Sequence, residues 1–208
     1  MIVKVCGMRE AANVEAVGSL GVEFIGFILF DRSPRYVADP APDTAEEVKR
    51  VGVFVNASEA QIAQEVARHR LDFVQLHGSE SVELCAALRN RGLGVIKAVS
   101  IATPEDMAQA AQYEGVTDYL LFDTKCVEYG GSGRRFDWSL LDGYNGSTPF
   151  LLSGGIDEDS AAEVGTIHHK MFAGVDLNSR FEVRPAVKDI TKLKMFLTRL
   201  KNEIEEID

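Results

Sequence analysis

The sequence of 208 residues has only three cysteines, Cys6, Cys85 and Cys126. An odd number at irregular spacing cannot form a full disulfide framework, and the chain has no CxxC pair or cysteine–histidine cluster of the kind that binds zinc. Reduced thiols in a reducing compartment are the simpler interpretation of this pattern. We therefore expect free thiols and no metal site.

The sequence also lacks long apolar runs and an excess of basic residues. No apolar run approaches the ~20 residues that a membrane-spanning helix needs, and the N-terminus has no basic segment followed by an apolar one. The formal net charge is −10, which disfavours a nucleic-acid partner because phosphate binding needs a basic field. We therefore expect a cytoplasmic globular protein with no nucleic-acid partner and no membrane partner.

Short runs of β-forming residues recur along the chain, and segments of helical periodicity lie between them. The helical segments are Ala57–Arg70, Glu80–Arg91, Thr103–Gln112 and Lys188–Ile204. Ser58 and Gln61 predict a capping box in the first of these, and Thr103-Pro104 suits the start of the third. The eight predicted strands are Ile2–Val5, Glu23–Leu29, Val51–Val55, Phe73–Leu76, Val95–Val99, Tyr119–Phe122, Phe150–Leu152 and Met171–Leu177.

Strands that alternate with helices indicate a parallel sheet of the α/β class, because parallel strands require crossover connections. Eight such strands predict a (β/α)8 TIM barrel. A doubly wound open sheet is the alternative, but Cys6-Gly7-Met8 after the first strand is not the GxGxxG turn of dinucleotide-binding sheets. No linker rich in Pro, Gly or Ser divides the chain, so residues 1–208 are predicted to form a single barrel domain.

Polar or reactive side chains follow the predicted strands, and this is where barrel enzymes place their active sites. Any one of these groups is also a common turn former, but the full set favours a polar floor at one end of the barrel. In chain order the strand ends read Cys6-Gly7, residues 30–35, Asn56, His77-Gly78, Ser100, residues 123–125, Ser153-Gly154-Gly155 and residues 176–179.

The motifs around these strand ends follow a specific order. They read KVCGM, SPRYV, VGVFVN, VQLHGSE, IKAVS, LLFDTK followed by GGSGRRFDW, LLSGGI, GVDLNSRFE and a late KD. From Lys4 to about Asp189 the chain thus resembles the phosphoribosylanthranilate isomerase family of tryptophan biosynthesis. The resemblance implies an isomerase that needs neither metal nor cofactor. It would convert N-(5'-phosphoribosyl)anthranilate to 1-(2-carboxyphenylamino)-1-deoxyribulose 5-phosphate by an Amadori rearrangement.

The resemblance assigns the catalytic base to Cys6, the cysteine of the KVCG motif. Taken alone, a thiol at a strand end is more often a small buried filler. The reaction, however, needs a base to remove the C2 proton of the opened sugar, and a thiolate serves when a cation or hydrogen bond lowers its pKa below about 8.5. Asp123 of LLFDTK is assigned as the general acid that protonates the ring oxygen, against the ordinary alternative of a turn or cap aspartate. Acid and base would then face each other across the barrel mouth.

The resemblance also implies which residues bind the substrate. Arg35 is placed at the anthranilate carboxylate, because a guanidinium can hold a carboxylate through two parallel hydrogen bonds. Arg32 is the second candidate, and a solvated surface arginine is the ordinary alternative for both. The phosphate is expected in the loops after strands seven and eight, at Gly154, Gly155, Asn178 and Ser179.

Several positions stay open at this point. His77 is a second catalytic group, a substrate-orienting group or a structural one, and Asp176 has no assigned role. The glycine-rich run at 130–133 favours a mobile lid over a third phosphate cradle. Arg180 and Ala186 stand where the family commonly has a small residue or glycine.

Two other functions compete with this interpretation. One is a related barrel isomerase acting on the ProFAR-type intermediate of histidine biosynthesis; that chemistry typically uses two aspartates, and Cys6 counts against it. The other is a non-catalytic barrel that only binds a phosphorylated ligand and would be stabilised by it without forming product. The sequence also leaves open whether the chain is a monomer or a homodimer.

Overall fold

The computed structural model describes residues 1–124 and 135–205, and within them eight parallel strands close into a barrel in sequence order. Closure comes from pairing between the first and last strands, in which Lys4 lies opposite Asp176. The predicted (β/α)8 barrel is therefore confirmed, and the open sheet is wrong. The strands are β1 Ile2–Val5, β2 Phe24–Ile28, β3 Lys49–Phe54, β4 Phe73–Leu76, β5 Gly94–Ile101, β6 Tyr119–Thr124, β7 Phe150–Leu152 and β8 Phe172–Leu177.

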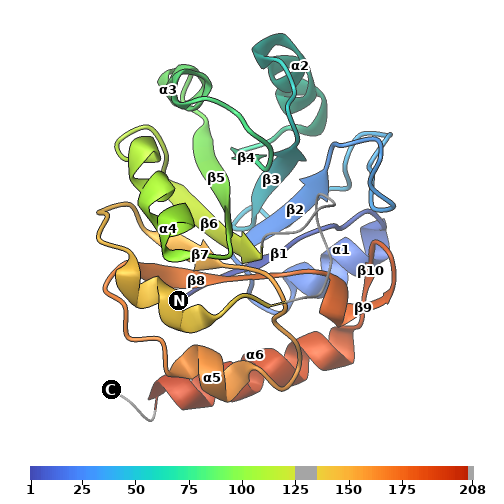
Figure 1. Cartoon of the computed structure of the whole chain (residues 1–208). Coiled ribbons are helices and arrows are strands. Elements are labelled where there is room, and N and C mark those ends of the chain that lie inside the picture. The colour runs from blue at the N-terminus through green and yellow to red at the C-terminus, as the bar shows by residue number, and fades with distance from the viewer. Residues whose placement is uncertain (125–134, 206–208) are drawn as a thin grey trace.

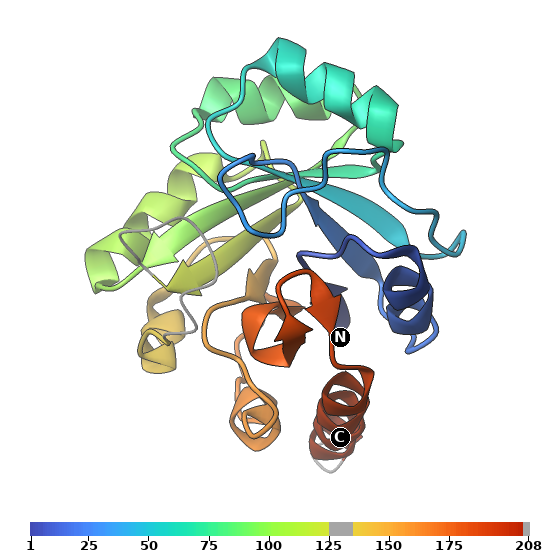
Figure 2. The same ribbon diagram turned by 90° about the vertical axis from the view of Figure 1, so that its right-hand side faces the viewer.

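Helices surround the barrel on its outer face (Figures 1 and 2). Residues 29–48, which connect β2 to β3, contain no helix. The α-helices are α1 Ala11–Gly18, α2 Glu59–His69, α3 Val82–Asn90, α4 Pro104–Ala110, α5 Ala161–Gly165 and α6 Ile190–Glu205. Three short 3-10 helices are η1 Ala111–Tyr113, η2 Trp138–Gly143 and η3 Ser179–Phe181. None of the helices formed by the described residues is both long and apolar enough to cross a bilayer.

Local sequence signals set the starts of two helices. Ser58 and Gln61 form the predicted capping box at the start of α2, each side chain accepting a hydrogen bond from the other residue's backbone N–H. Thr103 precedes α4, and Pro104 occupies its first turn, where the missing N–H costs nothing. Both predictions of a helix start are confirmed.

Alternation along each strand sends every second side chain into the barrel. On β6 these side chains are Tyr119, Leu121 and Asp123, in order toward the carboxyl end. Tyr119 and Leu121 belong to an apolar cluster inside the barrel, whereas Asp123 lines a cavity beyond it. The interior thus changes from apolar to polar toward the carboxyl ends of the strands. The buried members of the cluster are Phe24, Val51, Ile96, Ala98, Leu121 and Leu151.

A short antiparallel hairpin follows β8, formed by β9 (Glu182–Arg184) and β10 (Val187–Lys188). It lies beside α1 in Figure 1. The predicted helix start at Lys188 is wrong, because Lys188 is a buried strand residue and α6 begins at Ile190. Ala186 turns the hairpin with a φ of 68°, in the left-handed region that favours glycine.

Candidate active site

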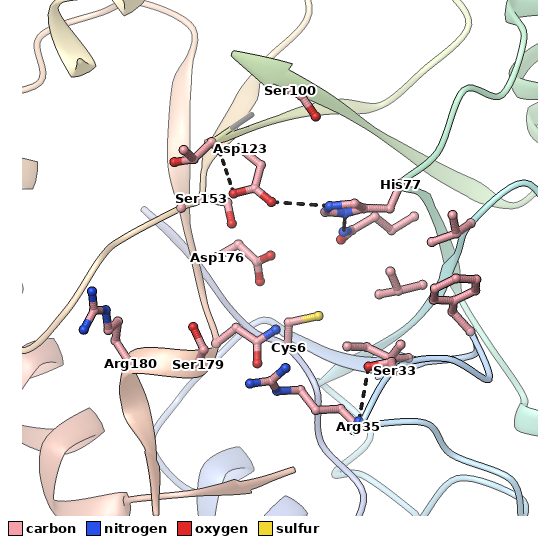
Figure 3. Close-up of a pocket in the computed structure, with 18 of the residues that line it drawn as sticks. Cys6, Ser33, Arg35, His77, Ser100, Asp123, Ser153, Asp176, Ser179 and Arg180 are labelled. Carbon is pink, nitrogen blue, oxygen red and sulfur yellow. Dashed lines mark hydrogen bonds and ion pairs between the residues drawn. The ribbon is translucent and has the colours of Figure 1, made fainter. Parts of the chain in front are cut away.

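A cavity of about 600 Å³ opens at the carboxyl-terminal ends of the barrel strands (Figure 3). Its lining comes from the strands and from the loops that follow them. The structure brings together in this one cavity all the residues predicted for the site: Cys6, Arg35, His77, Asp123, Gly154, Gly155, Asn178 and Ser179. Three further residues that the sequence analysis left without a definite role, Arg32, Asp176 and Arg180, also line the cavity.

Cys6 and Asp123 enter the cavity from different sides of the barrel, at the ends of β1 and β6. In the view of Figure 3, Asp176 lies between them. The Cys6 thiol is seated against Gly26 of β2, where a Cβ atom would come within 2.7 Å of Sγ. A glycine at that position therefore leaves the space that the thiol fills.

Asp123 has two contacts that fix its carboxyl group. Its Oδ2 lies 3.3 Å from Nε2 of His77, and its Oδ1 accepts a 2.8 Å hydrogen bond from the backbone N–H of Thr124. The other ring nitrogen of His77 lies 2.9 Å from Nε2 of Gln75. The amide NH2 of Gln75 donates this bond, so Nδ1 is the acceptor and His77 carries its proton on Nε2, directed at Asp123. Gly154 lies beside the same carboxyl, and a Cβ atom added at that position would come within 2.7 Å of Oδ1.

Cys6 is 3% exposed, and burial raises the pKa of its thiol. The ammonium of Lys4 opposes this shift. Lys4 is fully buried two residues earlier on the same face of β1, and its Nζ donates a 2.8 Å hydrogen bond to Oδ1 of Asp176. Although burial acts to lower the pKa of Lys4, Asp176 and Cys6 raise it overall, so Lys4 remains an ammonium group.

Arg35 forms a two-pronged ion pair with Glu182 of β9. Its Nε and Nη2 lie 2.8 and 2.7 Å from Oε1 and Oε2 of Glu182, and this hydrogen bonding raises the pKa of Arg35. Nη1 makes no hydrogen bond to any of residues 1–124 or 135–205. The guanidinium is therefore held along one edge and can offer the other edge to a ligand.

Glu182 also accepts a 2.7 Å hydrogen bond from Nζ of Lys188, which is fully buried. Burial acts to raise the pKa of Glu182, but the bonds from Arg35 and Lys188 hold it below its usual range. The same Nζ lies 2.8 Å from Oδ1 of Asn178. The side chain of Asn178 is thus directed at Lys188, so its part in a phosphate site would come from its backbone or its amide NH2.

The loops after β7 and β8 form the part of the cavity predicted for the phosphate. Gly154 and Gly155 have φ angles of 82° and 72°, a conformation that exposes successive backbone N–H groups. Ser179 begins the 3-10 helix η3 and lines the same cavity. Arg180, next in sequence, is exposed and also lines the cavity.

The other two cysteines and the glycine-rich run lie outside this set. Cys85 is a free thiol, as expected, fully buried on α3, and burial raises its pKa to about 11. Cys126 and the 130–133 run lie outside the described residues. Among the residues that are described, no group of three or more His, Cys, Asp or Glu side chains is arranged to hold a metal ion.

Residues 3–199 match the family model described as N-(5'phosphoribosyl)anthranilate (PRA) isomerase. The chain belongs to the N-(5'-phosphoribosyl)anthranilate isomerase family. It is 50% identical to the isomerase of Parabacteroides distasonis over 206 residues, covering 96% of this chain and 93% of that protein. It is 47% identical to the isomerase of Phocaeicola vulgatus, covering 99% of this chain and all of that protein.

Solved structures of the isomerase family share the fold. The phosphoribosyl anthranilate isomerase of Thermus thermophilus has a TM-score of 0.84 at 30% identity, covering 97% of this chain and 99% of that one. The Thermotoga maritima protein has a TM-score of 0.83 at 34% identity, covering 97% and 100%. A third family structure, with a TM-score of 0.82 at 30% identity over 97% of this chain, is a complex with reduced 1-(o-carboxyphenylamino)-1-deoxyribulose 5-phosphate.

As a member of the isomerase family, the chain is an aldose–ketose isomerase of the TIM-barrel class that acts in tryptophan biosynthesis. Its site also contains charged groups that sequence reasoning did not assign. Lys4 had a signal, because alternation on the first strand places it on the same face as Cys6. Glu182 and Lys188 lie in two of the quoted motifs, GVDLNSRFE and the late KD, but the hairpin that carries them is too short for a periodic pattern that would place their side chains.

Proposed function

We propose that this cavity converts N-(5'-phosphoribosyl)anthranilate to 1-(2-carboxyphenylamino)-1-deoxyribulose 5-phosphate, with Asp123 as general acid and Cys6 as general base. One observation supports this assignment above the others: the carboxyl of Asp123 enters the cavity from β6 and the thiol of Cys6 enters it from the end of β1, in a barrel of the isomerase family. Acid and base on separate strands can address different atoms of one bound substrate.

Asp123 acts first, by giving its proton to the ribose ring oxygen. The C1–O bond of the furanose breaks, and the amine nitrogen forms the double bond of a Schiff base to C1. Asp123 is left as a carboxylate, which the N–H groups of Thr124 and His77 stabilise through the contacts already present. His77 in this proposal is a positioning residue for the acid.

Cys6 acts second, as a thiolate that removes the proton from C2. The electrons of that C–H bond form an enolamine, and the nitrogen of the Schiff base recovers its lone pair. The C2 hydroxyl of the enolamine then loses its proton to become the carbonyl, while C1 gains a proton, and the product is the ketose amine. Each step moves only protons and substrate electrons, so the proposal calls for no metal and no cofactor.

The remaining polar groups of the cavity would hold the two anionic ends of the substrate. The open edge of the Arg35 guanidinium suits the anthranilate carboxylate, since Glu182 already fixes its other edge. The phosphate would bind the backbone N–H groups of Gly154 and Gly155, together with the loop that contains Asn178 and Ser179.

We further infer a cytoplasmic monomer or homodimer that acts on a small phosphorylated substrate. The free thiols of Cys6 and Cys85 and the net charge of −10 support this setting. A structure of the Thermotoga maritima isomerase is described as that of a dimeric enzyme, which makes the homodimer a reasonable candidate here.

The test is turnover of N-(5'-phosphoribosyl)anthranilate by the variants Cys6→Ala and Asp123→Asn, made separately. Each should lower kcat by about 10²- to 10⁴-fold, the usual contribution of one general acid or base. Cys85→Ala is the matched control, because it removes an equally buried thiol on α3, outside the cavity, and should leave kcat unchanged.

Near-normal kcat in either variant would contradict the role given to that residue. The ProFAR-type substrate should be assayed in parallel with the wild-type chain, and turnover of it alone would overturn the proposed substrate. Stabilisation by the substrate without any product would instead indicate a barrel that only binds a phosphorylated ligand.

A further inference from the structure

Cys6 occupies a site that is poor for a thiolate. It is 3% exposed, and its backbone N–H donates a 2.9 Å hydrogen bond to the carbonyl of Leu177. Gly26 packs against its sulfur so closely that a Cβ atom there would lie 2.7 Å from Sγ. Removing a thiolate from water in this way disfavours the charged form that a general base requires. The chain must therefore supply compensating positive charge from within the barrel.

Two fully buried lysines supply it from different elements. Lys4 lies two residues before Cys6 on β1, and its Nζ is 2.8 Å from Oδ1 of Asp176. Lys188 lies on β10, and its Nζ is 2.7 Å from Oε1 of Glu182 and 2.8 Å from Oδ1 of Asn178. Neither lysine side chain is exposed to solvent, so the charge of each is weakly screened. Burial lowers the pKa of Lys188, and the carboxylate of Glu182 opposes that shift and favours the ammonium form.

The contacts of Lys188 place it next to the strand end that carries the thiol. The Oδ1 atom of Asn178, which Lys188 holds, is 2.7 Å from the point where Gly7 would carry a Cβ atom, and Gly7 follows Cys6 directly. Glu182 cannot fully cancel the charge of Lys188, because the same carboxylate is shared with Arg35. The cluster of Arg35, Lys188 and Glu182 thus has one more positive than negative group.

Charged groups on several neighbouring elements influence the ionisation of Cys6. Lys4 and Lys188 favour its thiolate form, and Asp176 of β8 disfavours it. Arg35, from the loop after β2, is a further cation whose charge interacts with Cys6. Burial remains the largest influence and raises the pKa of the thiol overall, so the loss of either ammonium would raise it further.

We propose that Lys188, held by Glu182 and Asn178, is a positioning residue that stabilises the thiolate form of Cys6. Lys4 on β1 contributes a second positive charge to the same effect. This inference rests on the proposed role of Cys6 as the base. It assigns a catalytic purpose to the β9–β10 hairpin, which brings a buried ammonium to the thiol from outside the barrel strands.

The test titrates Cys6 in a chain whose other thiols are removed by Cys85→Ala and Cys126→Ser. Lys188→Met is the informative variant, since Glu182 keeps Arg35 as a partner and is not left as an unpaired buried charge. The ultraviolet absorbance of the thiolate, followed against pH, gives the midpoint of ionisation without requiring access of a reagent. Removing the nearby positive charge should raise the midpoint by about one pKa unit, so thiolate at neutral pH should fall about 10-fold, and kcat/KM with it.

Two further variants make the test specific. Lys188→Gln keeps hydrogen-bond donors for Glu182 and Asn178 but removes the charge, and it should show the same loss if Lys188→Met does not fold. Lys97→Met is the matched control, because Lys97 is a buried lysine paired with Glu80 at 3.1 Å and its charge does not act on Cys6. It should leave the Cys6 midpoint unchanged.

An unchanged Cys6 midpoint in folded Lys188→Met or Lys188→Gln would overturn the inference. That result would leave the proposed function intact, because the function is decided separately by turnover of Cys6→Ala. Conversely, full turnover by Cys6→Ala would remove the proposed base even if the titration showed the expected shift.

Discussion

The ring Nε2 of His77 lies 3.3 Å from Oδ2 of Asp123, which links the end of β4 to the end of β6 across the cavity. This contact gives His77 a more definite role than its sequence context could, because the imidazole addresses the proposed acid directly. It also makes two of the three open alternatives separable by kinetics, since a group that acts through Asp123 should affect the chemical step, and one that orients substrate should affect affinity.

Replacing His77 by Gln should lower kcat by about 10- to 100-fold and leave KM nearly unchanged, because a hydrogen bond to a charged group is worth about 1.5–3 kcal/mol. Steady-state kinetics with N-(5'-phosphoribosyl)anthranilate measure this split. His169→Gln serves as the control, since that ring is bonded to the carbonyl of Tyr144 at 2.8 Å and does not line the cavity. A raised KM at unchanged kcat would favour substrate orientation by His77 instead.

Replacing Arg35 by Lys should raise KM and lower kcat/KM by about 10-fold or more, because lysine cannot form the two-pronged pair with Glu182 and a second pair with a carboxylate. Arg32→Lys is the matched comparison, as Arg32 lines the same cavity from the same loop. If Arg32→Lys produced the larger loss, the carboxylate site would belong to Arg32.

Replacing Gly154 by Ala should impair both halves of the site. The new Cβ atom would come within 2.7 Å of Oδ1 of Asp123 and 2.8 Å of the backbone N of Thr124, at a φ of 82°. We expect kcat to fall and KM to rise together. Gly92→Ala is a close control, because its φ is 83° with no atom within 4 Å of the new Cβ. Gly92→Ala should lower the free energy of unfolding by about 1 kcal/mol and leave turnover intact. An equal loss of activity in both variants would show that backbone strain alone, and not contact with Asp123, causes the loss in Gly154→Ala.

The value of kcat/KM should rise with pH along a limb whose midpoint lies above about 8.5, the usual pKa of a thiol. The sign follows from the role of the group: a base must be deprotonated in the free enzyme, and burial raises the pKa of Cys6. The measurement is a pH profile of kcat/KM in the chain with Cys85→Ala and Cys126→Ser. A profile that is flat between neutral pH and pH 9 would mean that Cys6 is already a thiolate in the free enzyme, or is not the base.

The strands were largely predictable from the sequence because each is a short run of β-forming residues bounded by polar groups. The bounds of β1, β4 and β7 agree residue for residue with the predicted ones. The start of α2 was equally predictable, since the capping box of Ser58 and Gln61 lies within four residues of chain. Both features depend only on residues close together in the sequence, so they can be predicted without knowledge of the fold.

The electrostatic part of the site was not predictable in the same way. Lys4 pairs with Asp176 across 172 residues of sequence, and Arg35 pairs with Glu182 across 147. Such pairs form only when closure of the barrel sets β1 beside β8 and brings the loop after β2 to the hairpin that follows β8. Nothing in either local segment specifies its partner. Lys188 shows the same limit, because its position before an amphipathic segment favoured a helix, whereas the hairpin places it in the protein interior.

The central claim is that Cys6 and Asp123 act on different atoms of one substrate, and a structure of this chain with reduced 1-(o-carboxyphenylamino)-1-deoxyribulose 5-phosphate tests it most directly. The account predicts that the Sγ atom of Cys6 lies beside C2 of the ligand and that the carboxyl of Asp123 lies beside the oxygen that closes the ribose ring. A ligand whose C2 is out of reach of Cys6, with another side chain in contact with that carbon, would contradict it.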